Sequence, residues 1–192
     1  MRVVGGSFRG RPLASPKAGS SSIRPTADRT RESLFNILAH GWPDALSGAR
    51  VLDLFAGTGA VGVEAVSRGA GFVLFVEQSA QGRGLIRANI EAFGLQGVTK
   101  LFRRDATRMG EIGTMEQFDF VFADPPYGKG LAERALASLR DGGWLKPGAL
   151  VVVEESVDAG FAPPRGFALA DTRDFGDTRM YMMIGGEDDR TD

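Results

Sequence analysis

Residues 51–62 read VLDLFAGTGAVG, an apolar run that passes through a glycine-rich turn into a helical pattern. Gly57, Gly59 and Gly62 match the G-x-G-x-x-G spacing of dinucleotide-binding sites. Glu77 ends the next predicted strand about 20 residues further on, where an acid binds ribose hydroxyls. This strand, turn and helix therefore predict a nucleotide site, although a tight turn without any ligand is an alternative for the glycines alone.

The charge of Asp53, inside the same strand, argues against a dinucleotide. In dinucleotide-binding proteins the helix N-terminus and the loop amides receive a pyrophosphate, which is an anion. A carboxylate at this position would repel it. We therefore expect a cationic ligand that carries an ammonium and a sulfonium, namely S-adenosylmethionine, and a dehydrogenase is the weakest of the functions considered.

Residues 124–127 read DPPY and follow directly on the apolar run 118–123. Pro125 and Pro126 lack an N–H group and fix φ, so the carbonyl groups near them project from a rigid turn as acceptors. Asp124 adds a carboxylate and Tyr127 adds an aromatic face. The segment predicts a site for a flat heterocyclic amine, with an ordinary Asp-Pro-Pro turn as the alternative.

Hydrophobic periodicity alternates between strand and helix along the chain. Strands are predicted over residues 52–55, 72–76, 99–102, 118–123, 149–154, 167–172 and 179–184. Helices are predicted over residues 26–40, capped by Thr26, and over 60–68, 79–93 and 131–139. Right-handed crossovers then give a doubly wound α/β fold with seven strands, mostly parallel. The last strand is expected to be antiparallel because its connection is short, and residues 3–11 are expected to form a β-hairpin.

Composition indicates one globular domain. The chain has 192 residues, of which 43% are hydrophobic and 24% charged. We expect a methylating domain over 26–185 if the ligand assignment holds, with 1–25 as a basic extension of the same unit and 186–192 as an acidic frayed tail. The absence of Cys and the single His exclude disulfides, Cys-based zinc sites and paired-His metal motifs, so no metal is expected.

No apolar stretch approaches the ~20 residues that a membrane span needs. The N-terminus also lacks the apolar core of a secretory signal. We therefore expect a cytoplasmic protein without a membrane partner, and we expect a monomer.

Basic residues are concentrated at the N-terminus. The first 31 residues carry seven of them against one acid, Asp28. Such a segment favours a polyanionic partner, because phosphate contacts release counterions. Nucleic acid is therefore expected, although a solvated tail is the alternative for a segment rich in Gly, Pro and Ser. The candidate RNA-binding residues are Arg2, Arg9, Arg11, Lys17, Arg24, Arg29 and Arg31.

The run Asp53–Gly59, the acids Glu77 and Asp105, and the DPPY tetrapeptide resemble, in this order, Rossmann-like S-adenosylmethionine-dependent methyltransferases that act on exocyclic amines. The N-terminal segments VVGG (3–6), RGR (9–11) and RPTADRTRESLFN (24–36) resemble the start of bacterial 16S ribosomal RNA guanine-N2 methyltransferases. The resemblance covers nearly the whole chain, and its N-terminal part is more specific than the glycine motif. Ser79 departs from it, since relatives often carry an acid there.

The resemblance implies roles for particular residues. Glu77 would accept both ribose hydroxyls, Asp53 would face the methionine ammonium, and Asp105 with Ala106 would border the adenine. The implied cofactor contacts are Asp53, Phe55, Ala56, Gly57, Gly59, Glu77, Gln78, Asp105, Ala106 and Asp124. For Asp105 the alternative is simple surface pairing with Arg103, Arg104 or Arg108, and for Glu77 it is a surface acid. The helix from Thr26 is further expected to lie beside the cofactor, so that Arg31 or Asp28 closes the pocket.

The implied catalytic group consists of Asp124, Pro125, Pro126 and Tyr127. The lone pair of a guanine amine is delocalised into the ring, so it is a poor nucleophile. If the Asp124 carboxylate and the Pro125 carbonyl each accept one N–H, the nitrogen is drawn toward a pyramidal geometry, and Tyr127 can stack on the base. The expected function is methylation of guanine N2 in 16S ribosomal RNA, free or in the small subunit. Methylation of adenine N6 or protein glutamine, and non-catalytic RNA binding in ribosome assembly, are the alternatives.

Overall fold

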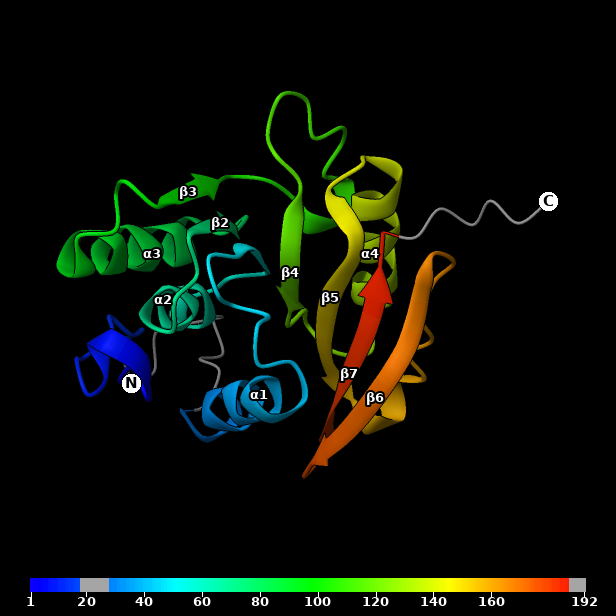
Figure 1. Cartoon of the computed structure of the whole chain (residues 1–192), viewed down its shortest axis with the longest axis horizontal. Coiled ribbons are helices and arrows are strands. Elements are labelled where there is room, and N and C mark those ends of the chain that lie inside the picture. The colour runs from blue at the N-terminus through cyan, green and yellow to red at the C-terminus, as the bar shows by residue number, and fades with distance from the viewer. Residues whose placement is uncertain (18–27, 187–192) are drawn as a thin grey trace.

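The computed structural model describes residues 1–17 and 28–186 of the chain (Figure 1). The expectations for Arg24, for Thr26 as a helix cap, for the boundary between residues 25 and 26, and for the tail 187–192 lie outside the described residues.

A single seven-stranded sheet forms the centre of the molecule, in the order β3-β2-β1-β4-β5-β7-β6. Its strands are β1 (Arg50–Leu54), β2 (Phe72–Val76), β3 (Thr99–Phe102), β4 (Phe118–Ala123), β5 (Leu145–Ser156), β6 (Phe167–Phe175) and β7 (Thr178–Gly185). The pairs formed among β1 to β5 are all parallel, and β7 is antiparallel to both β5 and β6. The predicted mostly parallel sheet with an antiparallel last strand is therefore confirmed.

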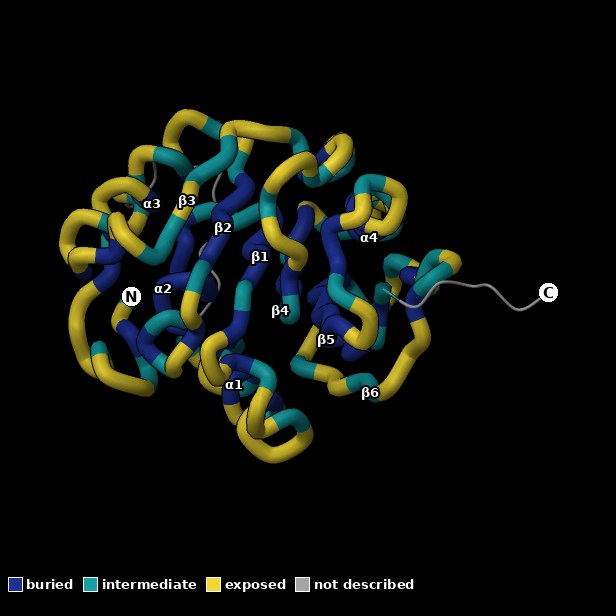
Figure 2. The backbone as a smooth tube through the Cα atoms, turned by 45° about the horizontal axis from the view of Figure 1, so that its top comes forward, coloured by how far each residue is buried: buried dark blue, intermediate teal, exposed yellow. Residues whose placement is uncertain are grey.

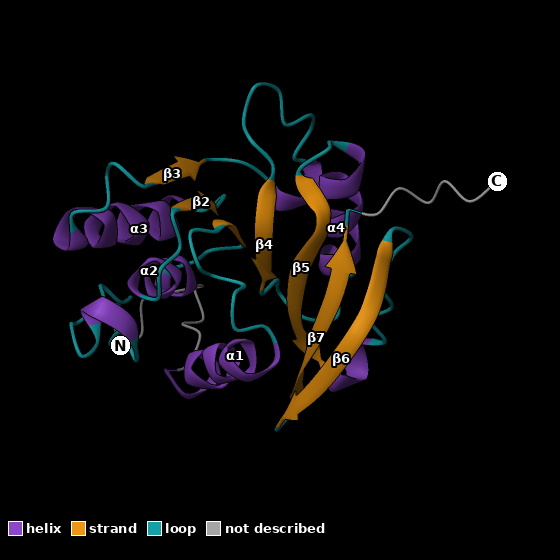
Figure 3. Ribbon diagram, in the orientation of Figure 1, coloured by secondary structure: helices purple, strands orange, loops and turns teal. Residues whose placement is uncertain are grey.

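Helices cover both faces of the sheet (Figure 3). The helices are α1 (Asp28–Gly41), α2 (Ala60–Ser67), α3 (Ala80–Phe93) and α4 (Leu131–Asp141), with short 3-10 turns η1 (Gly6–Phe8), η2 (Ala106–Arg108) and η3 (Val157–Ala159). One apolar core joins α1, α2 and α3 to one face, and a second joins α4 to the other. Because both faces are covered, the central strands are buried along their length (Figure 2).

Ser79, the departure from the family pattern, begins helix α3. Its Oγ accepts a hydrogen bond from the Gly82 amide at 3.0 Å, which is the usual role of an N-cap residue. Gly94 ends the helix in the left-handed conformation, at φ = +67°. An acid at position 79 is therefore not needed to start the helix that follows β2.

The N-terminal segment packs on the C-terminal ends of α2 and α3. Ser67 Oγ donates to the Gly5 carbonyl at 2.6 Å and accepts from the Phe8 amide at 2.9 Å. A Cβ at Gly6, where φ is +76°, would lie 2.0 Å from the Ser67 carbonyl oxygen. The paired glycines of the VVGG segment thus allow a close backbone contact with α2.

The same segment folds back on itself without forming regular strands. Within residues 1–17 backbone hydrogen bonds join Val3 to Gly10 and Arg11 and join Leu13 to Met1. The β-pairing there is an isolated antiparallel bridge between Arg2 and Pro12, and η1 occupies the turn. The expected β-hairpin over residues 3–11 is therefore not confirmed. Asn89, buried on α3, then accepts from the Ala14 amide at 2.8 Å and donates to the Thr58 carbonyl at 2.9 Å. The N-terminal segment is thereby joined to the glycine-rich turn.

Arg31 corrects one prediction. Its side chain is fully buried, with ion pairs to Glu64 on α2 at 3.4 Å and to Asp28 at 2.8 Å, and it donates to the Arg2 carbonyl. Glu64, also fully buried, pairs in addition with Arg68 at 2.9 Å. The assignment of Arg31 to RNA binding is therefore wrong for this fold, because its guanidinium holds α1, α2 and the N-terminal segment together.

We expect the Glu64→Gln substitution to destabilise the protein. Removing one partner of a buried ion pair costs about 3–5 kcal/mol, because the other charge stays buried without compensation. The free energy of unfolding in urea should fall by about 3 kcal/mol. Glu91→Gln, on an exposed position of α3, is the matched control and should change stability by less than about 0.5 kcal/mol. Equal effects of the two substitutions would contradict the role given to Glu64.

Candidate functional site

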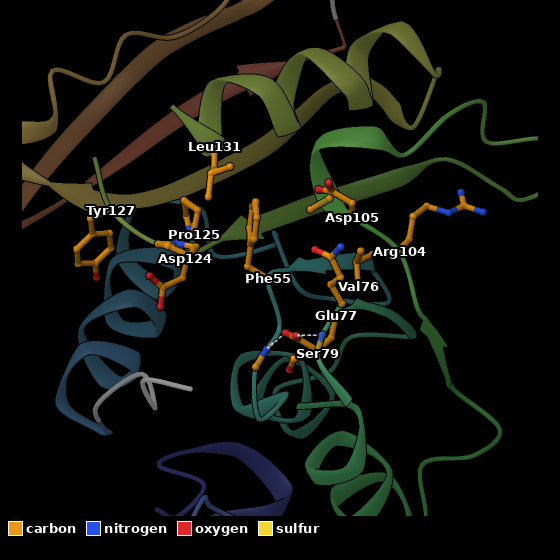
Figure 4. A pocket seen from close by; sticks show the side chains of 14 residues that line it. Phe55, Val76, Glu77, Ser79, Arg104, Asp105, Asp124, Pro125, Tyr127 and Leu131 are labelled. Carbon is orange, nitrogen blue, oxygen red and sulfur yellow. Dashed lines mark hydrogen bonds between the residues drawn. The ribbon is translucent and has the colours of Figure 1, made fainter. Parts of the chain in front are cut away.

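A cavity of about 730 Å³ opens at the carboxyl ends of the parallel strands (Figure 4). Its lining contains most of the predicted site. The lining residues are Phe55, Gly57, Val76, Glu77, Gln78, Ser79, Arg104, Asp105, Ala106, Asp124, Pro125, Pro126, Tyr127 and Leu131. A smaller cavity of about 40 Å³ beside it is lined by Asp53 and Ala56 and shares Phe55, Gly57 and Asp124 with the first. Gly59 lines neither cavity and caps α2 instead.

Four lining residues were not predicted: Val76, Ser79, Arg104 and Leu131. Val76 ends β2, Ser79 caps α3 and Leu131 begins α4. Each stands where a strand meets the helix after it, and ligands of open parallel sheets bind at that edge. Applying this rule to every strand end would have found them.

The turn after β1 is strained where it borders the cavity. Phe55 adopts φ = +54°, a left-handed conformation that costs a residue with a Cβ about 1–2 kcal/mol. Its ring stands between Pro125 and Glu77 in the cavity (Figure 4). Gly57 and Gly59 also have positive φ, where glycine carries no such cost. Strain of this kind is concentrated at functional sites.

Glu77 is held in a fixed orientation. Its carboxylate accepts from the Gly57 amide and from the Ser79 amide, each at 2.7 Å (Figure 4). A Cβ at Gly82 would lie 2.7 Å from Glu77 Cγ, so α3 can approach only because position 82 is glycine. Carboxylate oxygens accept more than one hydrogen bond, so capacity for ligand hydroxyls remains. The alternative of a loose surface acid does not fit this geometry.

Asp53 is the buried charge of the site, only 2% exposed. Its Oδ2 accepts from the Gly62 amide at 3.0 Å, in the first turn of α2, whose N-cap residue Gly59 offers no side chain. Burial raises the pKa of Asp53 well above its ordinary value, opposed by the Gly62 hydrogen bond and reinforced by the charges of Asp124 and Glu77. An anion at this helix start would meet carboxylates, whereas a cation would be stabilised by them.

Asp105 caps η2 at the other end of the cavity. Its Oδ1 accepts from the Thr107 amide at 2.9 Å and from the Thr107 hydroxyl at 2.8 Å. Desolvation acts against ionisation, but these hydrogen bonds and the charges of Arg108 and Arg134 prevail and lower the pKa of Asp105. Among the described residues no arginine forms an ion pair with this carboxylate. The surface-pairing alternative is therefore not what the geometry shows.

The DPPY segment is anchored on the end of β5. The Tyr127 hydroxyl donates to Glu154 Oε1 and the Gly128 amide donates to Glu155 Oε1, both at 3.0 Å. Both glutamates are buried, and as neighbours in a strand they point to opposite faces of the sheet. They thus hold the segment from two sides. Sequence reasoning missed them, although two adjacent acids at the end of an apolar run were a visible signal.

Arg2, Arg9 and Arg11 belong to the part of the N-terminal segment that lies away from the cavity. Helices α2 and α3 begin at the cavity, at the carboxyl ends of the strands, and run back toward the amino ends. The N-terminal segment packs there, on the C-terminal ends of the two helices. There Arg11 donates to the Ala92 carbonyl at 2.6 Å and stacks on the Phe93 ring, and Arg2 donates to the Gly10 carbonyl. Arg9, Lys17 and Arg29 are exposed. Neither Asp28 nor Arg31 lines the cavity, so the expected closure of the pocket by either residue is not seen.

The described part of the chain contains no group of three or more His, Asp or Glu side chains arranged to hold a metal ion. None of the helices described combines the length and the apolar character needed to cross a lipid bilayer.

Comparison with known proteins gives consistent results. Residues 1–184 match the family model described as Conserved hypothetical protein 95. The Ribosomal RNA small subunit methyltransferase D of Escherichia coli K12 is 38% identical over 161 residues, which are 83% of this chain and 77% of the relative. The enzyme of the same name from Haemophilus influenzae is 33% identical over 171 residues, which are 88% of this chain and 86% of the relative. The solved structure titled "Putative methyltransferase yhhF from Escherichia coli" superimposes with a TM-score of 0.81 and 30% identity, covering 98% and 99% of the two chains.

We expect Asp53 to make the ligand-free protein less stable as the pH rises. Above the ordinary carboxyl pKa of 3.8 the unfolded chain releases the proton, while the native state retains it up to the raised pKa of Asp53. The free energy of unfolding therefore falls with rising pH across this window. Asp53→Asn keeps an acceptor for the Gly62 amide but does not titrate. Urea unfolding at a series of pH values should show a smaller decline for the variant, and parallel curves would contradict the assignment.

Proposed function

The chain belongs to the Conserved hypothetical protein 95 family, and on this basis we propose that it transfers a methyl group to the exocyclic N2 amine of a guanine in small-subunit ribosomal RNA. It is a methyltransferase, and S-adenosylmethionine is its cofactor. The relatives named above support ribosomal RNA as the substrate. The choice of guanine N2 rests on the residues around Asp124.

The side chains of the cavity fit this cofactor. S-adenosylmethionine supplies an electrophilic methyl group on a positively charged sulfur. Asp53 would hold the ammonium, because a cation relieves the cost of its buried carboxylate. Glu77, fixed by two backbone amides, would accept the ribose hydroxyls. Asp105 and Ala106 would border the adenine. Phe55 would pack against the middle of the ligand, between its adenine and its methionine ends.

The observation that carries the proposal is the acceptor pair at the end of β4, on the cavity wall. The Asp124 carboxylate and the backbone carbonyl of Pro125 can each accept one N–H of an amine, and neither proline offers a competing donor. Accepting both protons localises the nitrogen lone pair. No strong general base is needed, because orientation of the reacting groups can contribute about 7–11 kcal/mol.

Asp at position 124 also favours guanine over the alternatives. Adenine-N6 and glutamine methyltransferases usually carry Asn at the first position of this tetrapeptide, and many have an additional target-recognition region. The longest connection between elements in residues 28–186 is the nine-residue segment 109–117, which leaves little chain for such a region. We therefore assign the N2 amine of guanine as the acceptor.

Tyr127 would bind the base by stacking. Its hydroxyl is bound to Glu154, which fixes the ring beside Asp124 (Figure 4). A base must leave its helical stack to reach this position, at a cost of a few kcal/mol. An RNA loop or a partly assembled subunit is therefore a better substrate than a regular duplex.

The test is incubation with methyl-labelled S-adenosylmethionine and small ribosomal subunits, or their RNA, from cells that lack this modification. We expect label in the RNA and N2-methylguanosine after digestion to nucleosides. N6-methyladenosine would overturn the substrate assignment, and label in ribosomal protein alone would overturn the class of substrate.

Asp124→Ala is the companion variant. It removes one of two fixed acceptors at the reacting nitrogen, and loss of one such preorganised group typically costs about 10²–10³ in kcat. Undiminished kcat in this variant would favour the alternative in which the protein only binds RNA. The melting temperature should stay near that of the wild type, since Asp124 is partly exposed.

We expect Tyr127→Ala to raise the KM for RNA by about 10- to 100-fold, because stacking on an aromatic ring contributes ~1–3 kcal/mol per base. Tyr127→Phe keeps the ring and loses only the hydrogen bond to Glu154, so its KM should change by a few-fold at most. Steady-state kinetics with subunits as substrate distinguish the two. If both variants raise KM equally, the hydroxyl rather than the ring face is responsible.

A further inference from the structure

Five cations lie on two adjoining segments that both contribute residues to the cavity. Arg103, Arg104 and Arg108 belong to the connection from β3 through η2, Lys129 to the turn before α4, and Arg134 to the first turns of α4. The two segments pack together, since the Met109 amide donates to Ser138 Oγ at 2.7 Å. Arg104 itself lines the cavity, and Figure 4 shows its side chain extending outward from it. We call these five residues the basic rim.

The charges of the basic rim are exposed and only partly compensated. Asp105 interacts electrostatically with Arg108 and Arg134, and Arg104 donates to the Met109 carbonyl at 2.6 Å. All five side chains are exposed, and in residues 1–17 and 28–186 none lies within ion-pair distance of a carboxylate. The acids on the same segments are Asp105 and Glu133 alone. Three other surface arginines do form ion pairs: Arg140 with Asp141, Arg173 with Asp171, and Arg179 with Asp174. Unpaired cations gathered at one opening attract a polyanion.

The cations at the N-terminus are differently placed. Arg31 is buried in ion pairs, and Arg2 and Arg11 donate to carbonyl groups at the edge of the sheet opposite the cavity. An RNA strand whose base enters the cavity must pass over its mouth. The phosphates next to that base therefore meet the basic rim before they can meet Arg2 or Arg9.

We propose that the basic rim is the main phosphate-binding surface for the RNA substrate, in place of the N-terminal cations Arg2, Arg9 and Arg11. This inference rests on the proposed function, and it names the surface that holds the substrate next to the reacting base. Arginine and lysine bind phosphate oxygens and release counterions, so this surface supplies affinity that depends on salt and not on sequence.

The test compares two double variants that remove the same charge. Arg103→Gln with Lys129→Gln removes one cation from each segment of the basic rim, and neither residue is among the predicted cofactor contacts or lines the cavity. Arg2→Gln with Arg9→Gln removes two exposed cations at the opposite edge. Binding to unmodified small-subunit RNA is measured by fluorescence anisotropy at several salt concentrations. Binding of S-adenosylmethionine and the melting temperature show that each variant is intact.

We expect the rim variant to bind RNA at least 10-fold more weakly in 0.15 M salt. Its slope of log affinity against log salt should fall by about 0.7–0.9 for each phosphate that the variant no longer neutralises. The Arg2 and Arg9 variant should bind like the wild type. A wild-type slope for the rim variant, or weaker binding confined to the Arg2 and Arg9 variant, would overturn the proposal.

The two proposals fail separately. If the wild type forms N2-methylguanosine while the rim variant binds normally, the methylation assignment stands and the basic rim is wrong. If the wild type methylates no guanine but binds the RNA, the comparison of the two double variants still decides where the RNA is held.

Discussion

The hydrogen bond from the Gly62 amide to the buried Asp53 carboxylate is the constraint on which the site depends. It joins the end of β1 to the start of α2 and takes the place of a side-chain cap at Gly59. It also fills the helix start with negative charge, where a related fold would bind phosphate. One contact therefore shapes the glycine turn and places a buried carboxylate where the proposed cationic ligand would bind. The positions of Glu77 and Phe55 around the cavity follow from that turn.

Much of the fold could be predicted because its strands are buried on both faces. The strands 72–76 and 118–123 begin and end where the apolar runs do, and the bounds of strand 99–102, which reads TKLF and is only partly buried, were also predicted. The prediction was too short at β5, which already begins at Leu145. Pro147 and Gly148 interrupt the pattern there, because both are exposed and the pairing with β4 is irregular beside them. Phe55 was assigned to a strand, yet its positive φ puts it in the turn.

Site residues that follow a strand end could be predicted from the sequence. Residues whose role depends on whether their side chain is buried could not. Glu77 and Asp124 each stand at such an end, so chain position alone locates them in the cavity. Arg31 and Arg103 are both arginines with another arginine close by in the sequence. In the structure, however, Arg31 is buried beside carboxylates, whereas Arg103 is exposed. The bonds of Tyr127 and Gly128 to Glu154 and Glu155 join residues 27 positions apart, which periodicity cannot relate.

The link through Asn89 has a consequence for the order of events during synthesis. Ala14 is bonded to a side chain 75 positions later in the chain, and Arg11 to the carbonyl of Ala92. Arg11 and Ala14 therefore lack these partners until helix α3 has emerged, whereas Gly5 and Phe8 can already bind Ser67 on α2. Contacts between distant parts of a chain form late, because the loop must close first. The contact of Ala14 with Asn89, which in turn holds the Thr58 carbonyl of the glycine turn, can therefore form only after α3 is made.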